Sequence, residues 1–415
     1  MEGWIESQEH IETFLSYGYL PQGGLDIHEN VLEAASGEPI NMPESDLINR
    51  AQTVLENVFE RRVANYPEST THLVPLSGSY DSRTILGGLL TNTAAENIQT
   101  VTFGVPGTLD YELGAQVAKR AGVKNLQIDL RPQKTTQSRE WYRTTAREQQ
   151  EPKVLFGSRD AFRRFEGEFD SDYILWTGYM GEAMAGDHLP PTPSESWEEA
   201  LEWFLTYNYD CPKLTTDTFD PMAVLPSEPA VDESLLSYDH QLDFGVRQPY
   251  RIAPSVITSE DTETPYLDPE WVSFILNVPR KYRTDRTLFR AAVTTLYDDL
   301  FDIQTDRHMG APEFLPEPAS VGYRYVRAGL TKLREESFGR QRPHENTNFI
   351  DWDYELRTSR TFRSFIKSLL FDLEDRNTAD WVDVREWLQR HENGEQITKE
   401  FRQLASLELY LALNE

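Results

Sequence analysis

The sequence has a single cysteine, Cys211, among its 415 residues. One thiol excludes an intramolecular disulfide and every metal site built from several cysteines. The eight histidines show no metal-ligand spacing either. The cysteine content therefore favours a reducing compartment.

Long apolar runs are also absent. No run approaches the ~20 residues that a membrane-spanning helix needs, and the segment Met1 to Trp4 lacks the basic and apolar regions of a signal peptide. No internal repeat is apparent. We expect a cytoplasmic protein that makes no contact with membranes.

Basic residues are scarce relative to acidic ones. There are 40 Lys and Arg against 69 Asp and Glu, which gives a formal net charge of -29. Such a surface repels nucleic acid and anionic membranes, so we expect neither as a partner. The acidic residues are spread along the chain and do not form a tail. Concentrated salt screens this self-repulsion. We therefore expect a protein of the salt-rich cytoplasm of a halophile, and the alternative is an acidic protein of an ordinary cytoplasm.

The segment from His72 to Leu90 changes from strand to helix across a polar loop. Leu73 to Leu76 is expected to form a short buried strand, and apolar residues recur at helical spacing after the loop Ser77 to Ser82. The unpaired N–H groups at the start of such a helix favour phosphate. Asp81 lies at this position, so the sequence predicts a phosphate that carries a metal ion.

Several strands and helices alternate around this loop. A helix is predicted from Ser45 or Asp46 to just before Asn65, and strands are predicted at 98–104, 125–130 and 173–176. Short connections between strands and helices imply a parallel sheet with right-handed crossovers. Ligands of such sheets bind beyond the carboxyl ends of the strands, where the turn that begins at Thr177 is expected to meet the first loop.

The loop Ser77 to Ser82 resembles the pyrophosphate loop, Ser-Gly-Gly-x-Asp-Ser, of the N-type ATP pyrophosphatases. The resemblance is closest to the synthetase domain of asparagine synthetase and β-lactam synthetase, and it covers roughly residues 45 to 320. Further blocks follow in that family's order, and they are Thr102–Asp110, Thr177–Glu182, Thr264–Phe274, Asp285–Arg290 and Asp306–Gly310. The resemblance implies an α/β fold of the adenine nucleotide alpha hydrolase-like (PP-loop ATPase) type, a parallel five-stranded sheet flanked by helices, with a helical C-terminal extension.

The resemblance also implies a site for ATP and Mg²⁺. Asp81 and Glu182 are expected to hold the Mg²⁺ that bridges the ATP phosphates, with Glu182 in the place of a family Asp. Arg286 stands where the relatives have a Lys that stabilises charge on the pyrophosphate or on the tetrahedral species. Tyr179 and Asp261 are the candidate proton-accepting pair. The residues expected to bind ATP are Leu76, Ser77, Gly78, Ser79, Asp81, Ser82, Phe103, Gly104, Thr177 and Gly178.

Four segments follow from the resemblance. Residues 1–45 resemble the end of a glutaminase domain. Residues 46–190 are expected to form the nucleotide-binding α/β core, and residues 191–320 the helical substrate-side part of the synthetase domain. Residues 321–415 are expected to form a C-terminal helical extension. The glutaminase nucleophile is a cysteine directly after the initiator Met, and position 2 here is Glu2. The chain is therefore expected to use ammonia, a substrate amine or a separate subunit that supplies ammonia.

The implied activity is an asparagine-synthetase-like, AMP-forming ligation of a small carboxylate to ammonia or an amine. Two alternatives remain open at this stage. Tyr179 matches the β-lactam synthetases, which favours intramolecular amide closure. Ser79 and Met180 replace family glycines, and Glu182 and Arg286 also depart from the family pattern. These departures leave open a protein that binds ATP as a regulatory partner without catalysis.

Two arginines in the predicted helical region after residue 232 have two interpretations. Arg247 and Arg251 are four residues apart, which places them on one face of an α-helix. They could bind a substrate carboxylate in bidentate fashion, or pair with the abundant acidic residues of the chain.

Overall fold

The computed structural model describes most of the chain. The described residues are 7–21, 23–35, 37–131, 138–149, 152–157, 161, 163–164, 168–169, 173–257, 262–311, 315–338 and 350–413. Glu2 and the candidate catalytic residue Asp261 lie outside these ranges. Among the described residues, no helix combines the length and the apolar character needed to cross a membrane.

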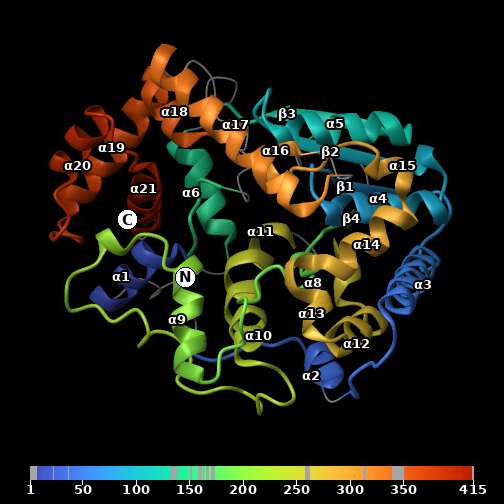
Figure 1. Ribbon diagram of the computed structural model, residues 1–415. Coiled ribbons are helices and arrows are strands. Elements are labelled where there is room, and N and C mark those ends of the chain that lie inside the picture. Colours follow the sequence, from blue (N-terminus) through green and yellow to red (C-terminus); the bar gives the residue numbers. More distant parts are fainter. Residues whose placement is uncertain are drawn as a thin grey trace.

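A five-stranded sheet, parallel throughout, forms the centre of the larger part of the molecule (Figure 1). The strand order is β3-β2-β1-β4-β5. The strands are β1 (Thr71–Pro75), β2 (Ile98–Gly104), β3 (Lys124–Asp129), β4 (Tyr173–Trp176) and β5 (Thr262–Glu263). The prediction of a parallel five-stranded α/β sheet is confirmed at this level.

The two faces of the sheet follow from the alternation of side chains along each strand. Val74 of β1 belongs to a large apolar core that also contains Ile85 and Val117 from the two crossover helices. Leu73, the next residue along, points to the other face and packs with Leu175 of β4. The central strand is therefore buried on both faces, as expected for a parallel sheet.

Helices surround the sheet and continue the chain on both sides of it. The helices α4 (Tyr80–Asn92) and α5 (Leu109–Ala121) pack on the sheet itself. The same apolar core also contains residues of α3 (Glu44–Val63), α12 (Pro269–Asn277), α14 (Thr287–Leu296) and α15 (Asp298–Phe301). The shorter ones are α2 (Glu29–Ala35), α8 (Gly181–Ala185), α10 (Tyr238–Leu242), α11 (Ala253–Val256), α13 (Arg280–Arg283), α16 (Arg307–Gly310) and the 3₁₀ turns η1 (Ala95–Asn97), η3 (Pro212–Leu214), η5 (Pro265–Leu267) and η6 (Thr284–Arg286). A π-helix, η4 (Asp243–Ile252), links α10 to α11.

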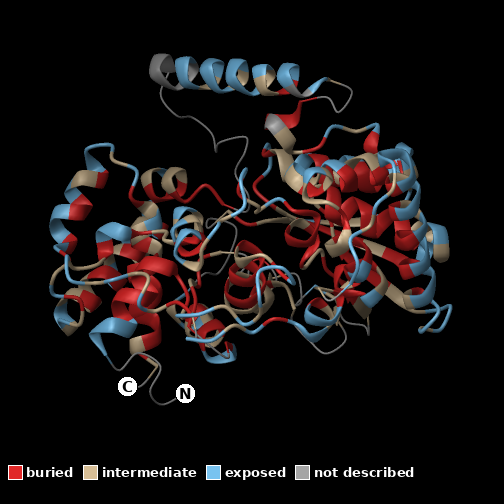
Figure 2. Ribbon diagram, turned by 60° about the horizontal axis from the view of Figure 1, so that its bottom comes forward, coloured by how far each residue is buried: buried red, intermediate tan, exposed pale blue. Residues whose placement is uncertain are grey.

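A second apolar core brings the two ends of the chain together. It is formed by α1 (Gln8–Tyr17), α6 (Arg139–Glu148), α18 (Trp352–Thr358), α19 (Arg360–Arg376), α20 (Val384–Glu392) and α21 (Thr398–Leu411). Phe14 of α1 meets Tyr410 of α21 edge to face, with 5.8 Å between ring centroids. Buried residues accordingly gather in two groups on either side of the molecule (Figure 2).

Two further helices complete the description. The first is α9 (Trp197–Asn208), and the second, α17 (Glu317–Phe338), follows the last block of the resemblance. Four apolar side chains of α17 are more than 60% exposed, and they are Tyr325, Val326, Leu330 and Leu333.

Candidate nucleotide and metal site

A cavity of about 330 Å³ lies beyond the carboxyl ends of β1, β2 and β4. This is the edge at which open parallel sheets bind their ligands. The expected residues that line the cavity are Leu76, Ser77, Ser79, Asp81, Ser82, Phe103, Thr177, Gly178, Tyr179 and Glu182. The tertiary structure therefore brings three separate sequence blocks to one cavity. Gly78 and Gly104 are adjacent in sequence to this wall without lining it.

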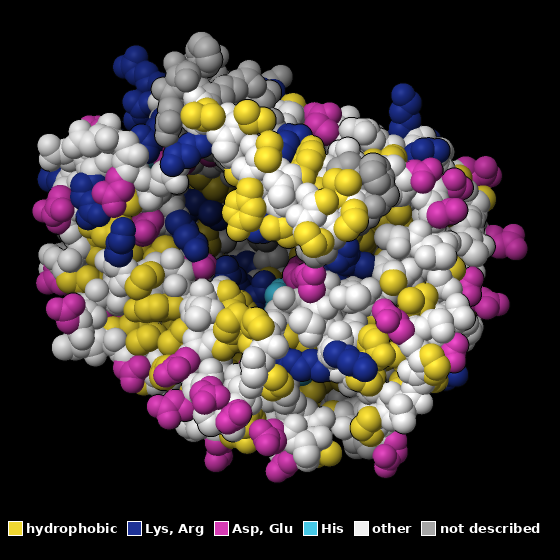
Figure 3. Space-filling model, viewed as in Figure 1, with side chains coloured by type: hydrophobic (Ala, Val, Ile, Leu, Met, Phe, Trp, Pro, Cys, Tyr) yellow, Lys and Arg dark blue, Asp and Glu magenta, His cyan; other side chains and the backbone are white. Residues whose placement is uncertain are grey.

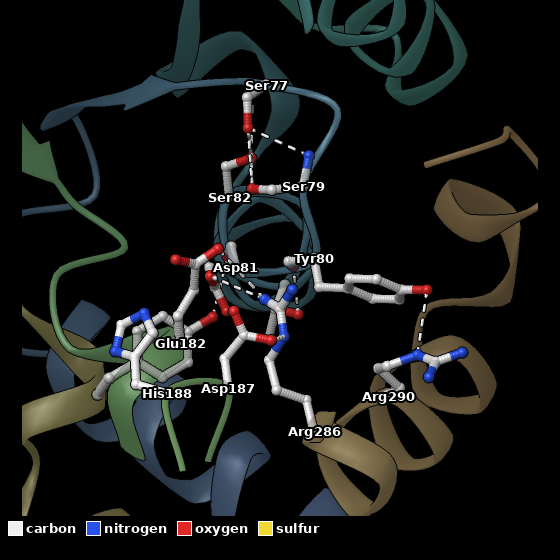
Figure 4. Close-up of polar contacts among 12 residues, drawn as sticks. Ser77, Ser79, Tyr80, Asp81, Ser82, Glu182, Asp187, His188, Arg286 and Arg290 are labelled. Carbon is white, nitrogen blue, oxygen red and sulfur yellow. Dashed lines mark hydrogen bonds and ion pairs between the residues drawn. The ribbon is translucent and has the colours of Figure 1, made fainter. Parts of the chain in front are cut away.

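Three hydroxyl groups form a cluster where β1 leads into α4 (Figure 4). Ser77 Oγ lies 2.9 Å from Ser79 Oγ and 3.1 Å from Ser82 Oγ. Ser79 occupies the N-cap position, and its side chain makes no capping hydrogen bond. The partial positive charge of the helix N-terminus is thus left to act on the cavity, where it favours an anion such as phosphate.

The backbone at Gly78 packs against the side chains of Asp110 and Asp306. Its N–H donates to Asp110 Oδ1 at 3.1 Å. A Cβ atom at this position would lie 3.1 Å from the same oxygen and 3.2 Å from Asp306 Cβ, so a side chain would have to displace them. Burial raises the pKa of Asp110, against the effect of the Gly78 N–H. Asp110 and Asp306 both line the cavity, and neither was assigned a role from the sequence.

The turn between β4 and α8 packs directly against Asp81. A Cβ atom on Gly181 would lie 2.8 Å from Asp81 Cγ, and one on Gly178 would lie 3.2 Å from Asp81 Cβ. Met180 adopts a left-handed conformation with φ of 66°, which suits the glycine that the family pattern has there. Tyr266 donates its hydroxyl to the Asp81 carbonyl at 2.9 Å. Three blocks of the resemblance therefore meet at one aspartate.

Asp81 and Glu182 converge, and the guanidinium of Arg286 lies between them (Figure 4). Arg286 Nη1 is 3.7 Å from Asp81 Oδ2 and 3.4 Å from Glu182 Oε1. Its Nε is 3.2 Å from Asp187 Oδ1. The two expected metal ligands thus face one position, and a cationic side chain of the protein occupies it. A metal ion bound by both carboxylates requires Arg286 to move away.

The backbone that presents Arg286 is strained. Asp285 and Arg286 both have φ of 56°, in the left-handed region that side chains disfavour. Two such residues cost about 1–3 kcal/mol each. The Asp285 carboxylate pairs with Arg307 at 2.7 Å, and the Arg286 guanidinium lies 5.6 Å from the centre of the Tyr80 ring. Strain of this kind is commonly found where a side chain must be held in one place for function.

Two carboxyl groups of the cavity, those of Asp81 and Asp306, are held away from water. Burial raises the pKa of Asp81 to about 8; Glu182 and Asp187 raise it as well, while Arg286 opposes them. Burial and the neighbouring Asp110 similarly raise the pKa of Asp306 to about 7. The Oδ1 atom of Asp81 is buried and has no hydrogen-bond partner among the described residues. A buried carboxylate oxygen in this state is stabilised by a cation.

The donor atoms fit a hard cation such as Mg²⁺. Asp81 and Glu182 supply carboxylate oxygens, which are the ligands that Mg²⁺ prefers. One ligand atom each of Glu182, Asp187 and His188 lie within 4.8 Å of one another. The described residues thus provide an acidic wall next to the hydroxyl cluster, which suits a metal-bound phosphate better than a free one.

An ion pair between His188 and Asp243 lies next to Glu182 and Asp187. His188 Nδ1 lies 2.9 Å from Asp243 Oδ2, and Arg247 Nη1 lies 3.5 Å from Asp243 Oδ1. Burial alone would raise the pKa of Asp243, but the charge of His188 and its hydrogen bond bring it to about 2. Burial lowers the pKa of His188, and Asp243 more than offsets this, so the pKa is raised overall. Sequence patterns gave no signal for either residue.

The two arginines of the predicted helix pair with different acids. They lie on a π-helix, Asp243 to Ile252, with Pro249 inside it. Arg247 pairs with Asp243, whereas Arg251 pairs with Asp210 at 2.8 Å. Of the two interpretations, pairing with acids of the chain is the one that the structure shows.

Tyr179 lines the cavity, as expected. Burial raises the pKa of its hydroxyl above the ordinary value, and the charges of Asp243 and Asp26 add to this effect. The hydroxyl therefore stays protonated at neutral pH. It can donate a hydrogen bond to a ligand, but it is poorly suited to accept a proton. Asp261, its expected partner, lies outside the described residues.

Comparison with known proteins adds little to this geometry. No family model matches the chain. A protein of Haemophilus influenzae described as "Uncharacterized protein" is 28% identical over 171 residues, which is 40% of this chain. The chain covers 27% of the length of that relative. The description of this relative names no activity, so only the geometry of the site bears on the function of the chain.

Proposed function

We propose that the protein is an AMP-forming carbon–nitrogen ligase of the asparagine synthetase type, built on a PP-loop fold. It would activate a small carboxylate with Mg²⁺ and ATP, then form an amide with ammonia or a substrate amine, without a glutaminase of its own. The observation that carries the proposal is a buried Asp81 carboxylate oxygen that has no hydrogen-bond partner among the described residues. The same carboxyl group lies near Glu182 beside the strand-to-helix loop, with Arg286 in contact with both.

Each part of the cavity has a role in this proposal. The serine hydroxyls and the N-terminus of α4 bind the phosphates, and Phe103 contacts the adenine. Asp81 and Glu182 would hold Mg²⁺, which would supply positive charge to the departing pyrophosphate. Arg286 would then contact the pyrophosphate oxygens in place of these two carboxylates.

The reaction balances as two displacements. A carboxylate oxygen of the substrate attacks the α-phosphorus of ATP, and the bond to the pyrophosphate oxygen breaks with its electron pair. The nitrogen of ammonia or an amine then attacks the acyl carbon, the carbon–oxygen bond to AMP breaks, and the nitrogen loses a proton to water. Binding both reactants in one cavity supplies much of the rate through positioning.

A protein that binds ATP without catalysis is the second candidate. One observation favours it: Arg286 fills the position between Asp81 and Glu182, and a guanidinium there removes the need for a metal ion. The cyclising alternative is less well supported, because the raised pKa of Tyr179 opposes its use as a base.

Measurement of pyrophosphate release separates these candidates. The protein is incubated with ATP, Mg²⁺, ammonium and a panel of mono- and dicarboxylates, and AMP and pyrophosphate are quantified. A ligase releases both in equal amounts with at least one acid, and Asp81→Asn abolishes the release. Binding of a non-hydrolysable ATP analogue without AMP from any acid would support the binding protein.

A further inference from the structure

One long helix, α17, packs little against the rest of the protein. It stands apart from the body of the molecule in Figure 2, where most of it is exposed. Its beginning is anchored, because Ser320 is buried and donates its hydroxyl to the Leu315 carbonyl at 3.2 Å. From residue 321 to residue 333 no residue is buried. Helices in water gain most of their stability from packing of an apolar face, and the described residues supply no such packing to this part of α17.

The large apolar side chains of α17 form one stripe along the helix. Its members are Tyr325, Val326, Leu330 and Leu333, each more than 60% exposed, and we call them the α17 stripe. Their spacing places them on one face of an α-helix, whereas the partly covered residues 323, 327 and 331 follow one another on a different face. Figure 3 shows hydrophobic side chains gathered along the line that α17 follows in Figure 1. An exposed apolar face of this kind marks an interaction surface.

Two glycines lie within the same face of the helix. Gly322 and Gly329 are seven residues apart, and a Cβ atom at either position would meet no atom of the described residues within 4 Å. With Val326 and Leu333 they form a row whose steps are four, three and four residues. This is the spacing at which two helices pack along a shared seam. A glycine in such a seam lets a second backbone approach closely.

A second copy of α17 fits this seam when the two helices run antiparallel. If Gly329 lies opposite Leu330 of the second copy, Val326 falls opposite Leu333 of that copy. The same contacts then occur twice, once in each direction, as a twofold interface requires. Each apolar residue in the middle of the seam therefore meets an apolar or a small residue.

The described charged residues of α17 do not oppose this pairing. Lys332 and Tyr325 lie on the same edge of the stripe, so antiparallel packing brings Lys332 of one copy near the Tyr325 ring of the other, which favours an ammonium group. Arg324 and Arg327 lie on other faces of the helix. Arg327 Nη1 donates to the Tyr323 hydroxyl at 3.0 Å within the same copy. No like charges of the described residues therefore meet in the seam.

The size of the contact indicates a reversible dimer. At about 1.5 Å per residue, the 22 residues of α17 span about 33 Å. One pair of helices buries less than the ~1,200–2,000 Å² of a standard protein interface, which is the range of weak and transient contacts. The net charge of -29 on each copy opposes association further at low salt.

We propose that the α17 stripe is a homodimer interface, at which it packs antiparallel against the stripe of a second copy of this chain. The twofold axis passes beside Gly329 and Leu330. Concentrated salt screens the repulsion between the two acidic copies, so the dimer becomes tighter as salt is added. This proposal does not rest on the proposed ligase activity.

Sedimentation velocity over about 1–100 µM protein measures the dimer. We expect the Kd to fall between about 0.1 M and 1 M KCl. Leu330→Glu and Leu333→Glu each place a carboxylate in the apolar seam and should raise the Kd about tenfold or more. Both side chains are largely exposed, so the melting temperature should not change. The matched control is Ala328→Glu, which adds the same charge at an exposed position of α17 outside the stripe and should leave the Kd unchanged.

Disulfide trapping tests the direction of the pairing. The single native cysteine, Cys211, is buried, so an added surface cysteine is the reactive one. Gly329→Cys lies beside the twofold axis and should form a dimer under mild oxidation. Val326→Cys mixed with Leu333→Cys should give more crosslinked dimer than either variant alone. Ala328→Cys is the control outside the stripe and should not crosslink.

The other outcomes overturn the interface. Sedimentation as a monomer at every concentration and salt, or a dimer that Leu330→Glu and Leu333→Glu leave unchanged, does so. Crosslinks of Val326→Cys and of Leu333→Cys each with itself, without the mixed product, overturn the antiparallel pairing. Vesicles of phosphatidylglycerol test another occupant: sedimentation with them that Leu330→Glu abolishes, in a protein that stays monomeric, assigns the stripe to a membrane surface. A dimer with these properties in a protein that forms no AMP retains the interface and overturns the ligase alone.

Discussion

Arg286 Nη1 lies 3.7 Å from Asp81 Oδ2, while the other oxygen of the same carboxylate is buried without a hydrogen-bond partner among the described residues. The guanidinium thus compensates the charge of Asp81 without satisfying both of its oxygens. Asp81 is thus suited to bind a cation, and the protein's own Arg286 partly occupies the position where that cation would lie. It makes the metal and the arginine competitors for one position, and the following predictions begin from that competition.

Replacement of Arg286 by methionine should raise the affinity of the nucleotide-free protein for divalent cations. In Arg286→Met the carboxylates of Asp81, Glu182 and Asp187 lose a shared counter-ion. A metal ion can then take the place of the guanidinium without having to displace it. We expect Mn²⁺, followed by paramagnetic resonance, to bind about tenfold more tightly. Ligase turnover should fall in the same variant.

The matched control for this variant is Arg290→Met. Arg290 contacts Tyr80 and Asp285, and no contact of it with Asp81 or Glu182 is present among the described residues. Its replacement should leave Mn²⁺ affinity unchanged. Weaker Mn²⁺ binding in Arg286→Met than in the unmodified protein would contradict competition between the two cations.

The stability of the ligand-free protein should fall as the pH rises. The pKa values of Asp81 and Asp306 are raised to about 8 and about 7, above the ordinary value of 3.8. The folded state therefore retains protons that the unfolded state releases, and this contribution is full below the unfolded pKa and lost as the pH rises through the folded one. Asp81→Asn should make this fall with pH shallower within that window.

Urea unfolding at pH 5 and at pH 8 gives the free energy of unfolding at each pH and so measures this difference. Further measurements at lower pH extend the series. Asp299→Asn, on the exposed surface of α15, serves as the control and should leave the pH dependence unchanged. An Asp81→Asn variant with the same slope as the unmodified protein would show that Asp81 is ionised throughout this range.

A methyl group on Gly181 should disrupt the site. Its Cβ atom would lie 2.8 Å from Asp81 Cγ and 3.0 Å from the Tyr266 ring, so both packed side chains must shift. We expect Gly181→Ala to reduce the free energy of unfolding by about 1–3 kcal/mol and to weaken Mn²⁺ binding. Gly329→Ala is the control, because its Cβ would meet no atom within 4 Å and α17 gains a better helix former.

Ser79 replaces a glycine of the family pattern, and restoring glycine should tighten phosphate binding. Ser77 Oγ donates to Ser79 Oγ at 2.9 Å, so Ser79→Gly frees a hydroxyl that faces the cavity. Glycine at an N-cap costs only a few tenths of a kcal/mol on average. We expect calorimetry to give a Kd for a non-hydrolysable ATP analogue lower by about twofold to tenfold.

The control for this change is Ser196→Gly, at the N-cap of α9. Its side chain accepts a hydrogen bond from Glu199 N, so the substitution costs helix stability far from the cavity. Nucleotide affinity should not change. A Ser79→Gly variant that binds the analogue more weakly would mean that the Ser79 hydroxyl itself contacts the phosphate.

The strands of the nucleotide core were predictable because each apolar run ends at turn-forming residues. The prediction for β2, residues 98–104, matches the observed strand, and the prediction for β1 differs from Thr71–Pro75 by one or two residues. The strand β5, Thr262–Glu263, was missed because two polar residues carry no alternation. An alternating sequence pattern indicates which residues of a strand are buried. The two residues of β5 show no such pattern, and they are in a strand because they pair with β4.

The site was predictable where a residue lies at the end of a predicted strand. Asp81 and Glu182 follow β1 and β4, and the parallel arrangement places both at one edge of the sheet. Asp243 could not be assigned in this way, since only the tertiary fold brings the π-helix to His188. The bridging position of Arg286 was equally hidden, because it depends on two left-handed residues in a turn that contains no glycine.

The most direct test of the central claim is the binding of a non-hydrolysable ATP analogue, such as α,β-methylene-ATP, by calorimetry with and without Mg²⁺. Asp81→Asn and Glu182→Gln are measured alongside the unmodified protein. We predict that Mg²⁺ tightens binding of the analogue about tenfold or more in the unmodified protein and that each variant loses most of this gain. Equal affinity with and without Mg²⁺, or a Mg²⁺ effect that both variants retain, would contradict the account.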